Sequence, residues 1–362
     1  MINKKILIFS HEFPPLGGGA GVVANQFAVE LTEIGYDVSV LCRYQETKKC
    51  KFKIIHNHNS SKLWFYGYKN ILDYNQFDLI FLNDPSAIYC AGLFFTKSQL
   101  QKSICFLHGS EPERVYETST FLRKISFFKY YFTKSLNSCS LIFTPSKFMK
   151  KKFLDQSNLF NLKEKITVLN YGVDNKIFYK KQKNKDINTL VFISVSRIEE
   201  KKGYKRKFYI FENLIKKYKI QNIRWKIVGD GRYLNELTTL VKNNNMEEYI
   251  EFVGKIDRSK LVDYYNESDI FWLLSDYEES LGLVYIEAQM SGLLAIGNNN
   301  AGVKEAISNK KSGFLINSDD EIYNIILNRL YLDIKEKEIV DFMKSFKLRE
   351  QVFELIKLVE KN

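Results

Sequence analysis

The chain has 362 residues, of which 45% are hydrophobic and 27% charged, and its net charge is +12. This composition excludes a disordered, collagen-like or coiled-coil protein, and the length suits two domains better than one core. The positive charge is concentrated in residues 1–180, which contain 24 Lys and Arg against 14 Asp and Glu, whereas the remainder contains 30 against 28.

No stretch reaches the roughly 18–20 consecutive apolar residues that a membrane-spanning helix needs. The apolar run at the N-terminus is too short for the core of a signal peptide, so we interpret it as a first buried strand. The five cysteines form no C-x-x-C pair. We interpret them as reduced thiols of a cytoplasmic protein rather than a disulfide framework or a zinc site.

Short β-branched or aromatic runs alternate with amphipathic segments along the whole chain, and buried parallel strands are typically such continuous apolar runs. The pattern predicts an α/β protein of two doubly wound domains. In the first half the predicted strands are 6–9, 37–42, 78–82, 103–108, 141–145 and 166–170. In the second half they are 188–196, 223–229, 250–254, 269–275 and 293–297.

A polar segment rich in Lys and Asn, residues 179–189, is expected to join the two domains. Near the C-terminus, DFMKSFKLREQVFELIKLVEKN has helical apolar periodicity and is expected to pack back on the first domain. The expected domains are therefore residues 1–180 together with about 343–362, and residues 181–342.

A glycine run, PPLGGGAG, follows the first predicted strand and precedes a helix. The amides of Gly17, Gly18 and Gly19 can approach a ligand closely, and the helix directs its positive end to the same place. The spacing differs from the dinucleotide-binding G-x-G-x-x-G. An anion cradle and a flexible turn are both compatible with the run.

His108 follows the predicted strand 103–108, in FLHGSEPE. Ligands bind at the carboxyl ends of strands in sheets of this type, so His108 is a candidate ligand contact. A lone histidine with a structural role is the alternative.

Basic and aromatic residues interleave in FLRKISFFKYYFTKSLNSCSLIFTPSKFMKKKF, residues 121–153. A solvated helix face is one interpretation, and a surface for anionic lipid or an acidic acceptor is the other. Nucleic acid is a weaker candidate because no recognition motif accompanies the charge.

Arg197 and Lys202 stand five positions apart in SVSRIEEKKG, which ends in Gly203. Two such cations can neutralise a diphosphate, the arginine as a fork and the lysine as a point charge. Surface ion pairs with Glu199 and Glu200 are the alternative.

Glu279 and Glu287 stand eight positions apart in DYEESLGLVYIEAQMSG. We expect Glu279 in a loop, Ser280 as the helix cap, and a helix that begins near Leu281–Gly282. A carboxylate accepts two hydroxyls at once, which suits a sugar or ribose diol. Two surface carboxylates are the alternative, but Glu287 is embedded in the apolar run LVYIEAQM, where an unpartnered charge is costly.

In order and spacing, these elements resemble the retaining glycosyltransferases of family 4, which have the two-domain GT-B fold. The family's R-x4-K-G element matches Arg197, Lys202 and Gly203, and its E-x7-E element matches Glu279 and Glu287. Lesser matches are IVGDGRYLNEL, IEFVGKIDRSKLVDYYNESDIF and VLNYGVDNKIF. The resemblance implies two Rossmann-like domains facing each other across a cleft, and it covers nearly the whole chain.

The resemblance also implies the role of each site residue. Arg197 and Lys202 would hold the donor diphosphate and stabilise it as a leaving group, Glu287 would bind the ribose, and Glu279 would contact the donor sugar. The remaining expected contacts are Gly17, Gly18 and Gly19 on the diphosphate from the first domain, backbone amides around Leu281, Gly282 and Leu283 on the phosphate, Lys255 and Ile256 on the base, and His108 on the sugar.

The implied reaction transfers a sugar from a nucleotide diphosphate sugar, UDP- or GDP-linked, to a hydroxyl acceptor. Because the first domain is basic and aromatic, we expect a membrane-proximal acceptor such as a lipid-linked saccharide or a cell-envelope glycan precursor, met in the cytoplasm or at an anionic inner membrane surface. Because charge stabilisation of the leaving group is the main catalytic term, and because no D-x-D lies near the site, we expect no metal and no cofactor. Two alternatives remain: a nucleotide-sugar 2-epimerase on the same fold, and a non-catalytic subunit of a heteromeric transferase.

Overall fold

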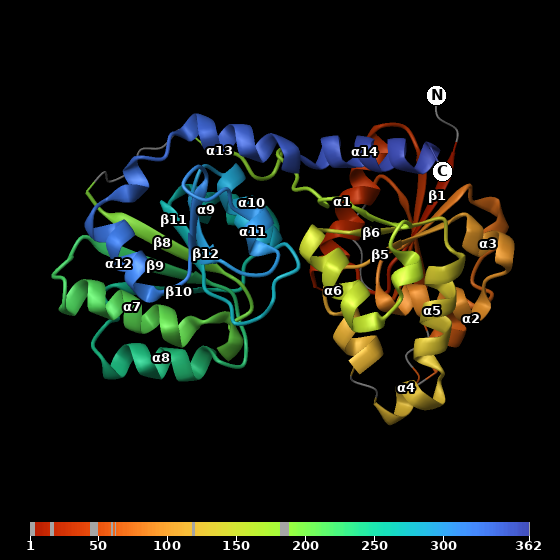
Figure 1. Ribbon diagram of the computed structural model, residues 1–362, viewed down its shortest axis with the longest axis horizontal. Coiled ribbons are helices and arrows are strands. Elements are labelled where there is room, and N and C mark those ends of the chain that lie inside the picture. The colour runs from red at the N-terminus through yellow and green to blue at the C-terminus, as the bar shows by residue number, and fades with distance from the viewer. Residues whose placement is uncertain are drawn as a thin grey trace. The chain divides into compact units, whose positions relative to one another are not determined.

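The computed structural model describes residues 4–14, 18–43, 50–58, 61, 63–117, 120–181 and 188–361 of the chain. It divides into two compact units (Figure 1). Unit 1 comprises Met1–Gly172 and Leu348–Asn362, and unit 2 comprises Val173–Lys347. Among the described residues, no helix has the length and apolar character needed to cross a bilayer.

Unit 1 is built on a parallel sheet of seven strands in the order β3-β2-β1-β4-β5-β6-β7. The order reverses between β1 and β4, so the loops that follow these two strands open side by side. The strands are β1 (Lys5–Phe9), β2 (Asp37–Arg43), β3 (Lys53–Asn57), β4 (Leu79–Leu82), β5 (Ser103–Phe106), β6 (Leu141–Thr144) and β7 (Ile166–Val168).

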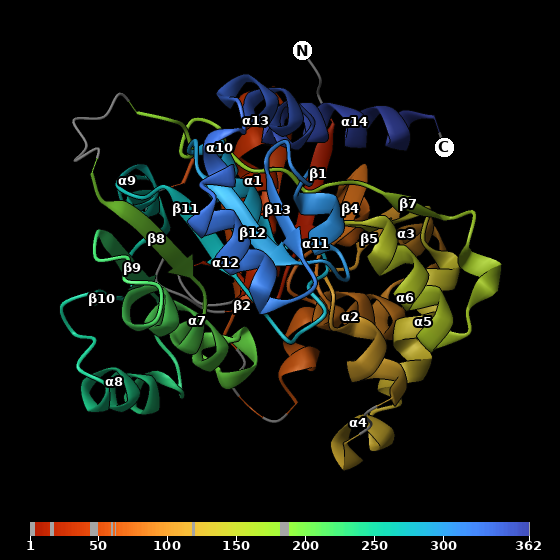
Figure 2. The same cartoon turned by 60° about the vertical axis from the view of Figure 1, so that its left-hand side comes forward.

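Helices cover both faces of this sheet. Helices α2, α5 and α6 share one hydrophobic core, and α1 and α14 lie side by side in Figures 1 and 2, joined by an Arg349–Glu30 ion pair of 3.6 Å. Side-chain caps fix several helix starts, as when Asp84 accepts the amide of Ala87 ahead of Pro85. The helices are α1 (Gly19–Glu33), α2 (Pro85–Phe94), α3 (Lys97–Gln101), α4 (Phe121–Ile125), α5 (Phe128–Ser138), α6 (Lys147–Ser157) and α14 (Leu348–Glu360).

Unit 2 repeats this plan with a six-stranded parallel sheet in the order β10-β9-β8-β11-β12-β13. The strands are β8 (Leu190–Val195), β9 (Ile223–Val228), β10 (Ile250–Gly254), β11 (Ile270–Leu273), β12 (Leu294–Asn298) and β13 (Gly313–Ile316). Helices α7 (Tyr204–Lys216), α8 (Leu234–Asn243) and α12 (Asp319–Leu327) pack on one face. Helices α9 (Leu261–Asn266), α10 (Leu283–Met290), α11 (Val303–Ala306) and α13 (Glu336–Met343) pack on the other.

The domain boundary lies earlier than the expected position between residues 180 and 181. Residues 173–181 belong to unit 2 because Phe178 is buried in its core and Asn266 of α9 bonds the backbone of Tyr179 and Lys181, at 2.9 and 2.7 Å. At the C-terminal end, Met343 and Phe346 are also buried in the unit 2 core. The helix expected over residues 343–362 therefore starts only at Leu348, and it belongs to unit 1.

The core of unit 2 contains a fully buried lysine. Lys207 of α7 donates from Nζ to Ser194 Oγ at 2.9 Å and lies 3.9 Å from the ring centre of Tyr204 and 5.4 Å from that of Trp225. Burial, reinforced by the nearby charge of Lys202, lowers the pKa of Lys207 well below its ordinary value. There is thus a pH range in which the Lys207 amine is neutral in the folded protein but charged in the unfolded chain.

Replacing Lys207 with methionine is expected to raise the free energy of unfolding near pH 7 by about 1–2 kcal/mol, because an apolar chain of similar length fills the site without a desolvation cost. Between the lowered pKa of folded Lys207 and its unfolded value near 10.5, the unfolded chain holds the extra proton, so the contribution of Lys207 to the unfolding free energy rises with pH over that range. Urea unfolding at neutral and alkaline pH should show a smaller rise for Lys207→Met. An identical rise in both proteins would contradict the neutral amine.

Candidate functional site

The predicted donor-binding residues lie at the carboxyl ends of the central strands of unit 2. Strands β8 and β11 are neighbours, and the strand order reverses between them. Ligands of open parallel sheets bind outside the strand ends at such a reversal. The loop after β8 carries Arg197 and Lys202, and the loop after β11 carries Glu279. The topology therefore brings the two sequence elements to one edge of one sheet.

Close backbone packing shapes the loop after β8. Gly203 has φ +67°, and a Cβ on it would lie 2.0 Å from the carbonyl oxygen of Leu274. Gly231, in the loop after β9, packs similarly, since its Cβ would lie 2.3 Å from the carbonyl oxygen of Ile198. Both positions need glycine for steric reasons. The glycine of R-x4-K-G thus lets the loop approach β11 and brings Lys202 to the loop that follows that strand.

Lys202 and Glu279 form an ion pair between the two loops. Lys202 Nζ donates to Glu279 Oε1 at 2.6 Å, and both side chains are largely buried. The loop is fixed by its backbone: the amide of Asp276 donates to the Lys201 carbonyl at 2.8 Å, and that of Gly302 donates to the Glu279 carbonyl at 2.9 Å. The pair engages one of the three N–H donors of the ammonium group. Glu279 therefore positions the ammonium group of Lys202, in addition to being a candidate ligand contact of its own.

Arg197 lies at the exposed rim of the same loop, with 77% of its side chain accessible. Its Nη1 donates to Glu199 Oε1 at 2.9 Å, as in the surface ion-pair alternative. Glu199 in turn accepts from the Tyr277 hydroxyl at 3.4 Å, and Lys202 Nζ lies 5.4 Å from the centre of the Tyr277 ring. These contacts connect Arg197 to the Lys202–Glu279 pair.

The helix that carries Glu287 starts later than expected. Its N-cap is Gly282, with φ +81°, and not Ser280; the helix begins at Leu283, with Leu281 buried ahead of it. A Cβ at position 282 would lie 2.6 Å from the Tyr285 ring, so the turn requires glycine. The N-cap residue is a glycine and has no side chain to accept from the first amides of the helix, and the positive end of the helix dipole lies at the site.

Glu287 is buried, with 5% of its side chain accessible, and sequence reasoning did not find its partner. Arg258 donates to Glu287 Oε1 from Nη2 at 2.5 Å and from Nε at 3.0 Å, and Tyr265 donates to Oε2 at 3.5 Å. The Arg258 guanidinium also lies 4.8 Å from the centre of the Phe178 ring. The only indication in the sequence was indirect: a buried carboxylate without a partner is costly, so a cation was to be expected next to Glu287.

Lys255 and Ile256 follow β10, in the loop that leads to Arg258. Lys255 is exposed, and Ile256 packs partly against the core that contains α10. Gly254, just before them, has φ +81°, which turns the chain at the end of the strand. Their expected contact with the base stays a prediction. Within the described ranges, no group of three or more His, Cys, Asp and Glu side chains is arranged to hold a metal ion.

In unit 1, the predicted glycine run follows β1, which lies where the strand order reverses. Gly18 is the N-cap of α1, Gly19 is its first residue, and Gly17 lies outside the described residues. The Gly18 amide donates to Glu12 Oε2 at 2.9 Å. Glu12, which the sequence analysis did not single out, thus accepts a hydrogen bond from one of the amides that were expected to bind an anion.

His108 lies after β5 with its imidazole fixed by backbone. Its Nε2 donates to the Asn83 carbonyl at 2.6 Å, while its own amide and that of Gly109 donate to the buried Glu111 carboxylate at 2.9 and 2.6 Å. Burial lowers the pKa of His108 to about 4, against the opposing effect of the Asn83 carbonyl. Near neutral pH the ring is therefore uncharged, with Nδ1 as a hydrogen-bond acceptor.

An NMR titration of the four histidines, with the His108→Asn variant for assignment, should give His108 a midpoint of about 4. Because this pKa is below the unfolded value of about 6.5, the unfolded chain binds the extra proton between these values. The contribution of His108 to stability is thus complete above pH 6.5 or so and is lost as the pH falls toward 4. A midpoint near 6.5 would show that the ring is solvated.

Comparison with known proteins gives the family. A model described as glycosyl transferases group 1 matches residues 175–329, and one described as glycosyltransferase family 4 matches residues 17–176. Together the two matches extend over residues 17–329, most of the chain. The chain belongs to glycosyltransferase family 4.

Its relatives and structural neighbours agree with this. An uncharacterised glycosyltransferase of Methanocaldococcus jannaschii is 24% identical over 98% of this chain and 92% of its own length. The alpha-monoglucosyldiacylglycerol synthase of Streptococcus pneumoniae is 29% identical over 138 residues, which are 38% of this chain and only 31% of that enzyme.

Among solved structures, HepE of Anabaena, in complex with UDP and glucose, has a TM-score of 0.78 at 16% identity, over 99% of this chain and 100% of that one. HepE is also solved with UDP-glucose. At this identity the likeness shows the fold, which is GT-B, as predicted.

Proposed function

We propose that the protein transfers a sugar, with retention of anomeric configuration, from a nucleotide diphosphate sugar to a hydroxyl acceptor. The observation that carries the proposal is the Lys202–Glu279 ion pair beside the glycine N-cap of α10, at the reversal point of the unit 2 sheet. A cation and a helix N-terminus at one place form an anion site, and the neighbouring carboxylate provides acceptors for sugar hydroxyls.

In this proposal the diphosphate lies at the start of α10. Lys202 donates to a phosphate oxygen with N–H groups that Glu279 does not engage, and the amides at Gly282 and Leu283 donate to the same group. Arg197 reaches the diphosphate from the exposed rim as a second cation, with Glu199 limiting its motion. Gly18, Gly19 and the preceding Gly17 are proposed contacts from unit 1.

The nucleoside is held farther along α10. Glu287 accepts hydrogen bonds from the ribose hydroxyls, and the hydrogen bonds from Arg258 orient its buried carboxylate. Lys255 and Ile256 offer backbone groups to the base from the loop after β10. UDP and UDP-glucose in the HepE structures support a nucleotide-sugar donor, and we propose a UDP- or GDP-sugar here.

Catalysis in this proposal is electrostatic. The bond between the anomeric carbon and the diphosphate breaks, and positive charge develops on the sugar. The acceptor hydroxyl enters on the face that the diphosphate leaves, and its proton passes to an oxygen of the departing diphosphate. Lys202, Arg197 and the helix N-terminus stabilise the departing diphosphate. Its departure is the step with the largest charge separation. Glu279 contacts the donor sugar, and neutral His108 accepts a sugar hydroxyl through Nδ1. The scheme requires no metal ion.

For the acceptor we propose a lipid-linked saccharide or a cell-envelope glycan precursor, met on the cytoplasmic side of a membrane. The name of the Streptococcus relative, a monoglucosyldiacylglycerol synthase, supports a lipid-linked acceptor. The basic and aromatic segment of unit 1 supports a membrane location.

A thermal-shift panel of nucleoside diphosphates and their sugars tests the donor, because a ligand of the folded state raises the melting temperature. We expect one nucleoside diphosphate to stabilise wild type and to stabilise Lys202→Ala much less. NMR of the product made from that donor sugar then reports the anomeric configuration. An inverted product, or release of a free epimerised sugar without acceptor, would overturn the proposed reaction.

A further inference from the structure

An exposed basic and aromatic surface lies at the tip of unit 1, where α4 projects beyond α5 in both overall views (Figures 1 and 2). We call it the α4–α5 surface and define it by Arg114, Val115, Phe121, Arg123, Lys124, Ile125, Phe127, Phe128, Lys129 and Tyr130. The chemistry of sugar transfer proposed above uses none of these residues, but the membrane location proposed for the acceptor rests on the segment that contains most of them.

Large apolar side chains are displayed on this surface rather than buried. The accessible fractions are 75% for Phe121, 59% for Ile125, 67% for Phe127 and 64% for Tyr130. Single exposed apolar residues are ordinary, but a group of four within one short segment of chain marks an interaction surface. The backbone of Phe127 has φ 50°, a conformation that residues other than glycine, asparagine and aspartate rarely adopt.

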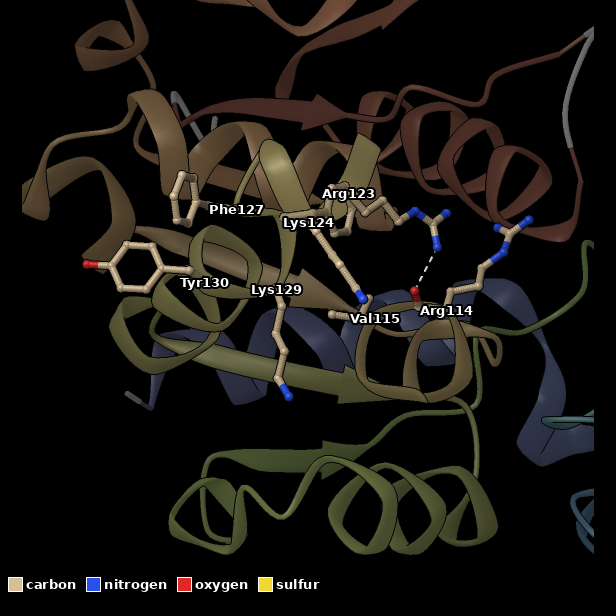
Figure 3. A pocket seen from close by; sticks show the side chains of 8 residues that line it. Arg114, Val115, Arg123, Lys124, Phe127, Lys129 and Tyr130 are labelled. Carbon is tan, nitrogen blue, oxygen red and sulfur yellow. Dashed lines mark hydrogen bonds between the residues drawn. The ribbon is translucent and has the colours of Figure 1, made fainter. Parts of the chain in front are cut away.

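The same surface contains a pocket of about 370 Å³ whose lining combines four basic side chains with apolar and aromatic ones. Figure 3 shows Phe127 and Tyr130 on one side of it and Arg114 and Arg123 on the other, with Lys124 between them. Arg123 donates from Nη1 to the Arg114 carbonyl at 2.7 Å, which holds the two arginines together. Burial and the charge of Arg114 lower the pKa of Arg123, so the two guanidinium groups repel each other.

Within the described part of the chain, Arg123, Lys124 and Lys129 form no ion pair with a carboxylate; Arg114 lies near enough to the buried Glu111 for its positive charge to oppose the raised pKa of that carboxyl. Residues 121–154 contain no Asp or Glu, and their basic residues are Arg123, Lys124, Lys129, Lys134, Lys147, Lys150, Lys151 and Lys152. The local field is therefore positive, and it selects an anionic partner.

The helices that carry the α4–α5 surface are packed against the rest of unit 1. Phe128 of α5 stacks on Tyr89 of α2 with ring centres 4.5 Å apart. A Cβ on Gly92 of α2 would lie 1.9 Å from the Tyr131 carbonyl, so α2 and α5 are in close backbone contact. The π-helical turn Glu113–Glu117, which carries Arg114, is tied to α6 by the Glu113–Lys152 ion pair. The exposed side chains are thus presented by packed elements.

We propose that the α4–α5 surface binds the face of a bilayer that contains anionic phospholipid. Lipid phosphate groups enter the cationic pocket, and Phe121, Ile125, Phe127 and Tyr130 insert at the level of the head groups. A bilayer offers negative charge directly above an apolar layer, which matches cations flanked by exposed aromatic and aliphatic side chains. A soluble acidic peptide or a nucleic acid satisfies the charge but gives the four apolar side chains no apolar layer.

Vesicle sedimentation of the full chain, without donor or acceptor, tests this separately from sugar transfer. We expect binding to phosphatidylcholine vesicles that contain phosphatidylglycerol, and at least about tenfold weaker binding to phosphatidylcholine alone or in about 1 M salt, where the Debye length is near 3 Å. Equal binding to both vesicle types, or none to either, would overturn the proposal. This comparison uses wild type, so it does not depend on the folding of any variant.

Two variants then locate the surface. The charge reversal Arg123→Glu with Lys124→Glu, and separately Phe127→Ser, should each weaken binding to the anionic vesicles about tenfold or more. Matched controls on unit 2 are Lys310→Glu with Lys311→Glu, an adjacent exposed pair, and Leu332→Ser, whose side chain is 66% accessible. The controls should bind like wild type. Equal losses in variants and controls, or competition by soluble inorganic phosphate as strong as by vesicles, would contradict a bilayer-binding surface.

Discussion

Replacing Lys202 with alanine is expected to lower kcat/KM for sugar transfer by about 10²–10³-fold, the range measured when one preorganised donor to a developing negative charge is removed. Lys202 is the cation most firmly placed at the start of α10, because Glu279 fixes its ammonium at 2.6 Å. The substitution also leaves the Glu279 carboxylate without its partner at the position assigned to the diphosphate. A loss in kcat as well as in nucleotide affinity is therefore expected.

Steady-state kinetics with the stabilising nucleotide sugar measure this effect. Lys205→Ala is the matched control, since Lys205 is exposed on the first turn of α7, three residues away along the chain. The control should retain wild-type kinetics, and Lys202→Ala should keep a cooperative thermal unfolding transition. Near-normal turnover in a folded Lys202→Ala protein would remove Lys202 from the reaction.

Replacing Arg258 with methionine is expected to lower the free energy of unfolding by about 3 kcal/mol. Removing one member of a buried ion pair leaves an uncompensated charge, which costs about 3–5 kcal/mol, and the lower end applies because a quarter of the Arg258 side chain is accessible. Nucleotide binding should fall in parallel, since Glu287 then loses the group that orients it. Adding Glu287→Gln should restore part of the stability, because the amide carries no charge to leave unpaired.

Urea unfolding of the two single variants and the double variant measures this coupling. The matched control is Arg224→Met, which removes a half-exposed arginine 4.0 Å from Glu248 and 5.1 Å from the centre of the Tyr249 ring. An exposed pair of this kind contributes about 0–1 kcal/mol. Equal destabilisation by Arg258→Met and Arg224→Met, or no recovery in the double variant, would show that the Glu287 site is not a buried, charged one.

Most of the fold was predictable because buried parallel strands leave continuous apolar runs. The eleven runs named from the sequence all contain strands. The two missed strands, β3 and β13, lie at the edges of their sheets. β3 is the lysine- and histidine-containing segment KIIHN, largely half-exposed, and β13 is the four-residue segment GFLI after a glycine-closed turn. The half-exposed side chains of β3 weaken its apolar pattern, whereas β13 is buried but has only four residues, the first of them a glycine.

The candidate site was predictable where a motif fixes local spacing and unpredictable where tertiary contact decides. Ser280 is a good capping residue, but Gly282 takes the cap because only glycine fits beside Tyr285 with φ +81°. Arg258 lies in the segment after β10, whereas Glu287 lies in α10, which follows β11. No fixed sequence spacing therefore predicted that the two side chains form an ion pair. Lys207 shares the helical face of Tyr204, Phe208 and Phe211, yet its charge argued against burial.

The most direct test of the account is a crystal structure of the protein with the nucleoside diphosphate that stabilises it. We predict the diphosphate at the start of α10, with a phosphate oxygen within hydrogen-bond distance of Lys202 Nζ and of the Leu283 amide, and the ribose hydroxyls on Glu287. A nucleotide bound elsewhere, with Lys202 bonded only to Glu279, would contradict it.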